Sequence, residues 1–171
     1  MKTTVIGAAI GLAVIAAAAG VANAGSVRSG TETIKGTTTA NPSGGITVHA
    51  SGVFTATGIF KIPSTDKATT VHWVFPRGTL SARSSAVSNG PLHLNSGTCA
   101  ASEASYVSYV ISPRQSTGAY AGATGHGHAV VTWSADFPRR AGGACDFGQN
   151  VNPKPGTERE TLFIQGPLTL R

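Results

Sequence analysis

Residues 116–128 read STGAYAGATGHGH, and this segment is the strongest indication of architecture in the chain. Four of its thirteen residues are glycine, and the apolar run Ala129–Trp133 follows at once. Glycine weakens a strand and marks a bulge, a sharp bend or a close backbone approach. Repeated bends are what a sheet needs in order to close on itself. The segment therefore predicts a small closed β-barrel, with its glycines where the barrel turns. A phosphate-binding loop is excluded because that use needs a helix after the glycines.

The first residues have the features of a secretion signal. Lys2 supplies a short positive region, an apolar run covers residues 5–21, and Ala22-Asn23-Ala24 fits the small-x-small cleavage pattern. The alternative is an uncleaved membrane anchor, because the run is about long enough to span a bilayer. We favour a signal peptide over residues 1–24, cleaved after Ala24, and no second long apolar run follows. The expected mature protein is secreted and extracellular.

Composition and charge narrow the class of protein. Charged residues make up 12% of the 171 residues, and 22 residues are glycine, which is typical of a β-rich secreted chain. The formal net charge is +6, but the basic residues are scattered and only Arg139 and Arg140 are adjacent. A nucleic-acid partner is not expected without a basic cluster. A loose association with the anionic cell envelope is compatible with this charge.

The chain has two cysteines, Cys99 and Cys145, separated by 46 positions (145 − 99). An exported chain meets oxidising conditions, so one disulfide is the favoured state. The chain-entropy relation gives such a bridge about 4 kcal/mol of stabilisation. The alternative is a pair of free thiols. Because there is no Cys-x-x-Cys, the cysteines give no indication of metal or redox chemistry, and no cofactor is expected.

Short strands separated by Gly and Pro turns recur along the rest of the chain. Residues 25–45 are predicted to be a flexible Ser/Thr/Gly-rich lead-in, with one edge strand around 32–36, followed by a single barrel domain over 46–171. The predicted strands are 46–62 (one bent strand or two short ones, with bends at Gly52 and Gly58), 71–75, 79–83, 92–95, 106–111, 129–135, 161–164 and 168–170. This pattern predicts an all-β barrel or sandwich. An immunoglobulin sandwich is disfavoured because Trp133 lies only 12 residues before Cys145.

Three segments carry a resemblance to a known family: VFPRGT at 74–79, TGAYAGATGHG at 117–127 and FIQGPLTL at 163–170. They resemble segments of small exported actinobacterial proteins assigned to the allene oxide cyclase barrel-like domain, which is related to plant dirigent proteins. The two cysteines also fall where that group tends to carry cysteines. The resemblance covers roughly residues 52–171 and implies an eight-stranded antiparallel barrel with an apolar interior. The resemblance does not imply a particular activity, because proteins that share a fold need not share a function.

Aromatic residues are the best candidates for a binding site. In residues 106–111, alternation places Tyr106 on one side of a strand and Tyr109 on the other. A small barrel is either filled by its side chains or keeps room for one ligand. The functional alternative to a packed core is a pocket for a small apolar or aromatic molecule, with tyrosine hydroxyls orienting it. The candidate ligand-binding residues are Trp73, Tyr106, Tyr109, Tyr120 and Trp133.

No catalytic residue can be named from the pattern. His126 and His128 would point to one side of a strand and could share a metal, but a third ligand is missing from the spacing, so a solvent-facing pair is favoured. The chain has seven acidic residues, mostly in predicted turns or loops: Glu32, Asp66, Glu103, Asp136, Asp146, Glu158 and Glu160. Neither Gly-x-Ser-x-Gly nor His-Glu-x-x-His occurs.

Three functions remain open. The favoured one is a non-catalytic exported barrel that binds a small apolar ligand or a cell-surface partner. The others are a structural envelope protein with a filled barrel, and an isomerase, cyclase or dirigent-like enzyme working in the barrel cavity. An open pocket above about 300 Å3 would favour binding. Interior polar side chains would favour the enzyme, and the oligomeric state is left open.

Overall fold

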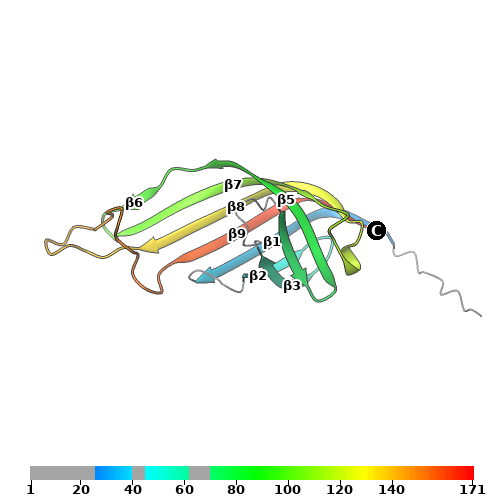
Figure 1. The fold of residues 1–171 in the computed structure, drawn as a ribbon, viewed down its shortest axis with the longest axis horizontal. Helices are drawn as coiled ribbons and strands as arrows, with labels where there is room; N and C mark the ends of the chain where they lie inside the picture. The colour runs from blue at the N-terminus through cyan, green and yellow to red at the C-terminus, as the bar shows by residue number, and fades with distance from the viewer. Residues whose placement is uncertain (1–25, 40–44, 62–69) are drawn as a thin grey trace, which may run out of the picture.

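The computed structural model describes residues 26–39, 45–61 and 70–171 (Figure 1). The predicted signal peptide and its cleavage site at Ala24 lie outside the described residues. The described elements are β1 (Arg28–Thr39), β2 (Ile46–Ser51), β3 (Ala56–Lys61), β4 (Thr70–Phe75), β5 (Gly78–Asn89), β6 (His93–Asn95), β7 (Ala100–Ile111), the 3-10 turn η1 (Gly118–Tyr120), β8 (Thr124–Asp136) and β9 (Arg159–Leu170).

The strands close into an antiparallel barrel, as predicted. Their order in the sheet is β5-β4-β3-β2-β1-β9-β8-β7-β6, and an additional pairing joins β5 to β7. That pairing closes eight strands into a ring and leaves β6 attached to the outer edge of β7. No α-helix occurs in the part of the chain that the structure describes.

The N-terminal lead-in predicted over residues 25–45 is instead largely a barrel strand. β1 pairs with β2 on one side and along its whole length with β9 on the other, so it is not an edge strand. Its threonines and glycines give it the composition of a linker, but threonine is a good strand former, Ile34 belongs to the core, and Gly36 is buried against β2. The barrel domain therefore begins by Arg28, not at residue 46.

The ends of two other elements also differ from expectation. Residues 46–62 form two short strands, β2 and β3; Gly52 lies in the turn between them and Gly58 lies within β3. The predicted break at Gly166-Pro167 does not interrupt β9. Proline cannot donate to a sheet ladder. The β8–β9 register skips from Gly125↔Leu168 to His128↔Gln165, so the ladder is open beside Pro167, while the other edge of β9 stays paired with β1.

A long extension projects from one end of the barrel (Figure 1). It contains β6, the adjoining ends of β7, β8 and β9, and the loop 137–158. The predicted disulfide between Cys99 and Cys145 is formed there. Beside it, Phe137 packs between Trp133 and Phe147, with ring centroids 6.5 and 5.5 Å apart. The turn η1 and the C-terminus lie at the opposite end of the barrel.

Candidate functional site

The barrel interior holds two groups of aromatic rings. In the first, Trp73 packs between Phe60 and Tyr109 with centroid distances of 5.9 and 6.0 Å. In the second, Phe54, Phe75 and Tyr120 contact one another with centroid distances of 4.9 to 5.6 Å. All six rings are buried, and Trp73 is only 1% exposed. The first group fills the barrel, whereas the second borders an opening.

That opening is a pocket of about 270 Å3 at the end of the barrel where η1 lies. Its buried lining residues are Phe54, Tyr120 and Leu170, and two exposed arginines, Arg28 and Arg77, stand at its mouth. Its remaining lining residues are Thr55, Ala56, Thr57, Pro76 and Ala119. The volume is slightly below the roughly 300 Å3 at which ordinary ligand pockets begin. A ligand here would be smaller than a typical drug-sized molecule.

A close backbone crossing holds one wall of this mouth pocket in place. The N–H of Ala119 donates to the carbonyl oxygen of Arg77 over 2.8 Å. A Cβ atom added to Gly118 would lie 2.9 Å from Cα of Gly78, so both positions need glycine for the two chains to approach. The crossing fixes η1 against the β4–β5 turn. It therefore sets Tyr120 and Arg77 on the same pocket.

A buried carboxyl group, Glu32, supports the part of the wall that Phe54 forms. The side chain is 4% exposed, and its Oε2 accepts a hydrogen bond of 3.1 Å from the N–H of Phe54. Burial raises its pKa above the ordinary value, against the opposing effect of backbone N–H groups at Phe54, Val53, Ser51 and Thr33. Glu32 thus joins β1 to the β2–β3 turn that carries Phe54. Its Oε1 is buried without a hydrogen-bond partner.

Tyr109 lies in the same region of the barrel as this carboxyl group. Burial, and after it the negative charge of Glu32, raise the pKa of Tyr109 to about 12. Glu32 pairs with Gly166 in the β1–β9 ladder, and a Cβ added to Gly166 would lie 2.9 Å from the Tyr109 hydroxyl oxygen. The indole Nε1 of Trp73 is a second buried polar atom without a partner. A carboxyl, a phenol and an indole N–H therefore share the interior of a mostly apolar barrel.

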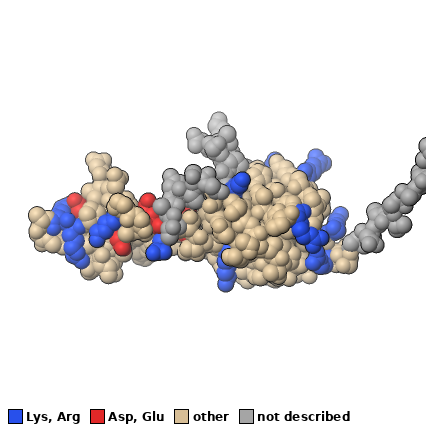
Figure 2. Space-filling view, turned by 90° about the horizontal axis from the view of Figure 1, so that it is seen from below, with Lys and Arg blue, Asp and Glu red and all other residues tan. Residues whose placement is uncertain are grey.

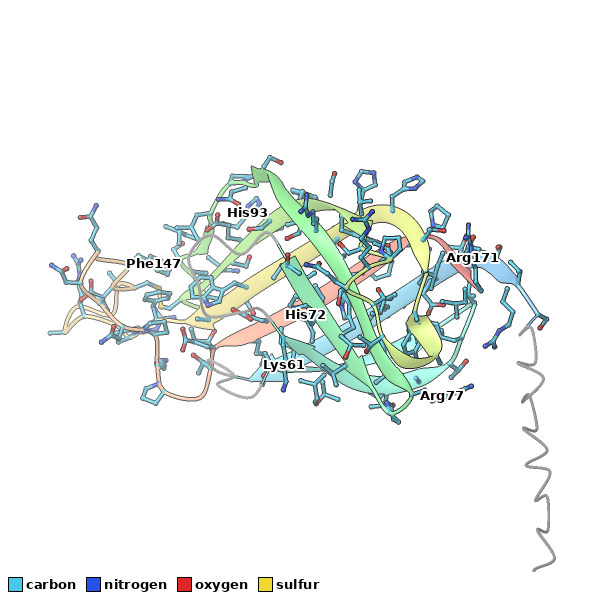
Figure 3. The ribbon with its side chains drawn as sticks, turned by 45° about the vertical axis from the view of Figure 1, so that its right-hand side comes forward. Lys61, His72, Arg77, His93, Phe147 and Arg171 are labelled. Carbon is cyan, nitrogen blue, oxygen red and sulfur yellow. A yellow bond between two sulfur atoms is a disulfide. The ribbon has the colours of Figure 1, made fainter. Side chains whose placement is uncertain are left out.

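Tyr120 connects the interior with the arginines of the mouth. Burial raises the pKa of Tyr120, while the positive charge of Arg77 lowers it, Glu32 raises it and Arg28 lowers it. Its phenol is therefore within electrostatic reach of both arginines and of the buried carboxyl. Figure 3 places Arg77 at the same end of the molecule as Arg171, with Phe147 at the far end of the extension.

The five aromatic residues expected to bind a ligand do not form one cluster. Trp73, Tyr109 and Tyr120 lie inside the barrel, but only Tyr120 lines the mouth pocket. Tyr106 is 46% exposed on the outer face of β7, as the alternation with buried Tyr109 requires. Trp133 is half-buried in the extension, against Phe137. Of the five candidate ligand-binding residues, Tyr106 and Trp133 therefore do not line the barrel interior.

Two groups of site residues, Glu32 and the pair Arg28 and Arg77, were not among the predicted ones. Glu32 was placed in the lead-in, although Glu32, Ile34 and Gly36 alternate with threonine and lysine and all three are buried. That period-two pattern is the signal that could have placed the carboxyl inside a barrel. No feature of the sequence indicated that Arg28 and Arg77 belong to the site, because the pattern of strands and turns does not show which turns meet at one end of the barrel.

The two neighbouring histidines of β8 lie on the outer surface. His126 and His128 are both exposed, and Nδ1 of His128 lies 3.4 Å from the Ser108 hydroxyl. Among the described residues, no group of three His, Cys, Asp or Glu side chains is placed to hold a metal ion. Within the same residues, no helix has both the length and the apolar character needed to cross a membrane.

Two further hollows lack the buried aromatic lining of the mouth pocket. One of about 670 Å3 lies along the outer wall near Val110, His126 and Pro167, all of which are exposed. The other, of about 230 Å3, lies at the base of the extension near Asp136 and Arg159. Neither contains a buried aromatic residue, so among these hollows of the described residues the mouth pocket is the best candidate site.

Comparison with known proteins adds no relative: no family model, no curated protein and no solved structure matches the chain. The class of the molecule is therefore defined by its own geometry, as a closed antiparallel barrel of eight strands with one disulfide. The disulfide is the bond expected of a protein that folds in an oxidising compartment.

Proposed function

We propose that the protein is an exported, non-catalytic β-barrel that binds one small, predominantly apolar molecule in the mouth pocket. The observation that carries the proposal is the lining of that pocket, where Phe54, Tyr120 and Leu170 present buried apolar surface at an open end of the barrel. Concave sites with apolar walls and few polar groups are the usual form of small-molecule sites. Export is supported by the N-terminal signal pattern and by the disulfide.

The fixed walls of the pocket also support binding. One wall is held by the crossing between η1 and the β4–β5 turn, and the other by the hydrogen bond from Phe54 to Glu32. A site that exists before the ligand arrives avoids the entropic cost of ordering its walls. The resemblance to the allene oxide cyclase barrel-like group, whose barrels have apolar interiors, is in agreement and stays a prediction.

Native mass spectrometry tests the proposal on protein purified from its own culture medium. A bound molecule should appear as one added mass per chain and should be released by mild activation. The variant Ala119→Trp, which fills the pocket, should lack the added mass. Ala121→Trp is the matched control, because exposed Ala121 does not line the pocket. A bare chain, together with no binding of small apolar probes, would support the structural envelope protein instead.

A second candidate function is an isomerase or cyclase, and the interior carboxyl is what favours it. Glu32 Oε1 is buried without a partner and the charge of Glu32 acts on Tyr109, so a carboxyl and a phenol share one region of the barrel. Acid–base chemistry needs two such placed groups. The test is to extract the molecule bound to wild type and to Glu32→Gln. An enzyme should yield chromatographically distinct isomers from the two, whereas a carrier should yield the same compound.

A further inference from the structure

We infer that the ligand of the mouth pocket is a compact organic anion, an aromatic-sized apolar body bearing one carboxylate or sulfonate that Arg28 and Arg77 bind together. The inference rests on the proposed function, because it assigns a ligand class to the same pocket. Its basis is the placement of two arginines from distant parts of the sequence around one aromatic-lined opening.

Backbone pairing fixes the position of both arginines. Arg28 is the first residue of β1 and pairs with Leu170, which lines the pocket. Arg77 lies in the β4–β5 turn, where its carbonyl oxygen accepts the N–H of Ala119. The two cationic side chains therefore start from rigid points on the same rim. The positive charges of both arginines lower the pKa of Tyr120. The phenol of Tyr120 can donate its O–H to a bound anion.

These two arginines have no acidic partner among the described residues. The one ion pair there joins Arg140 to Asp146 in the extension, over 2.8 Å. In Figure 2 the acidic side chains gather toward the extension, whereas the end of the barrel away from it shows basic side chains without acidic neighbours. Two like charges facing one pocket repel each other, and an anion between them removes that repulsion.

Glu32 is the one acidic group whose charge reaches Tyr120, and it does not serve as the missing partner. Its side chain is buried inside the barrel and its Oε2 is engaged by the N–H of Phe54. Among the described residues no ion pair joins Glu32 to either arginine. The guanidinium groups are therefore left for a ligand, and their planar donor arrangement matches a carboxylate or sulfonate.

The shape of the pocket restricts the rest of the ligand. Phe54 and Tyr120 form a tilted aromatic pair with centroids 4.9 Å apart, and a flat ring can pack against them. The volume of about 270 Å3 is too small for a long extended chain. An inorganic anion could bind the arginines but would not cover the rings of Phe54 and Tyr120.

Calorimetric titration of the full disulfide-bonded protein with three probes tests the inference. The probes are 2-naphthoate, its neutral analogue 2-naphthalenemethanol, and inorganic phosphate. We expect 2-naphthoate to bind roughly tenfold or more tightly than either of the others, a ratio that corresponds to about 1.4 kcal/mol. Arg28→Gln and Arg77→Gln should each weaken its binding about tenfold and abolish the preference for the anion. Arg83→Gln, an exposed arginine outside the pocket, is the matched control and should bind as wild type does.

The outcomes separate the two proposals. Equal binding of the acid and the alcohol, with both pocket variants behaving like Arg83→Gln, would overturn the anionic ligand and leave the proposed function standing. If phosphate bound as tightly as 2-naphthoate, the claim that the ligand carries an apolar body would be overturned. If no naphthalene probe binds, and Ala119→Trp does not alter the native mass spectrum, the proposed function fails together with the inference. Circular dichroism on each variant confirms that the fold is intact.

Discussion

The ring of Tyr109 lies directly over Gly127, its partner in the β7–β8 ladder. A Cβ atom at residue 127 would lie 2.6 Å from the Tyr109 hydroxyl oxygen and closer still to the carbonyl oxygen of Gln165. Gly166 on β9 borders the same ring. Two glycines on neighbouring strands thus create the space that a buried phenol occupies. The absence of a side chain is as important here as the bends that glycine allows.

Gly127→Ala should therefore destabilise the barrel by about 1–3 kcal/mol, the usual cost of forcing extra atoms into a packed core. The free energy of unfolding, measured by denaturant titration, checks this. Gly142→Ala is the control, because a Cβ there would meet nothing within 4 Å. Equal stability of the two variants would show that Tyr109 does not occupy this space.

The pH dependence of stability should report on Glu32. Its folded-state pKa is raised above the ordinary value of 4.5, so between these two values the folded chain holds more protons than the unfolded chain. Stability contributed by this group is then complete below about pH 4.5 and is lost as pH rises through the raised pKa.

Unfolding curves of wild type and Glu32→Gln between pH 4 and pH 8 isolate this effect, since all other titrating groups are common to both proteins. The difference in unfolding free energy should shift in favour of the variant as pH rises. A difference that does not change with pH would mean that the carboxyl is not desolvated in the folded state.

Gly122→Val should lower stability through backbone strain alone. Gly122 has φ +74°, and an added Cβ would meet nothing within 4 Å, so no clash contributes. A β-branched residue in this left-handed region costs about 1–3 kcal/mol. Thermal melting checks the prediction against Gly142→Val, where space is open and φ is ordinary. A melting temperature equal to that of the control would be inconsistent with the left-handed conformation.

Removing the disulfide should loosen the extension and spare the mouth pocket. The bridge closes a separation of 46 residues, for which the chain-entropy relation gives about 4 kcal/mol. The double variant Cys99→Ala/Cys145→Ala should unfold at lower denaturant, with faster hydrogen exchange around residues 137–158. Its affinity for 2-naphthoate should equal that of wild type. A weakened affinity would show that the two ends of the molecule are coupled.

Local sequence signals predicted the parts of the fold that depend on neighbours in the chain. The glycine-rich segment and the short apolar runs predicted a closed barrel, and the alternation through Tyr106 and Tyr109 predicted that the two lie on opposite faces of one strand. The even number of cysteines in a chain with a secretion signal predicted the disulfide. Strand lengths were predicted less well, because Gly, Pro and Thr within β1 and β9 have local preferences that pairing on both edges overrides.

The candidate site was only partly predictable. Tyr120 was expected to contact a ligand and lines the pocket, but the choice between Phe54 and the other core aromatics could not be made from spacing. Trp133 has the strand context of an interior residue, yet the end of β8 on which it lies continues beyond the barrel into the extension. A strand pattern gives the face of a residue but not its distance along the barrel axis.

The sequence by itself determined the class of this protein: an all-β chain with one disulfide and with glycines where strands must approach closely. These properties depend on residue type and on period-two patterning, which are local. Only the tertiary structure decided that Glu32 is inside the barrel and that Arg28, Arg77 and Tyr120 meet at one mouth. Those residues lie 49 (77 − 28) and 43 (120 − 77) positions apart in the chain. Their meeting depends on strand register and barrel closure, which no local pattern specifies.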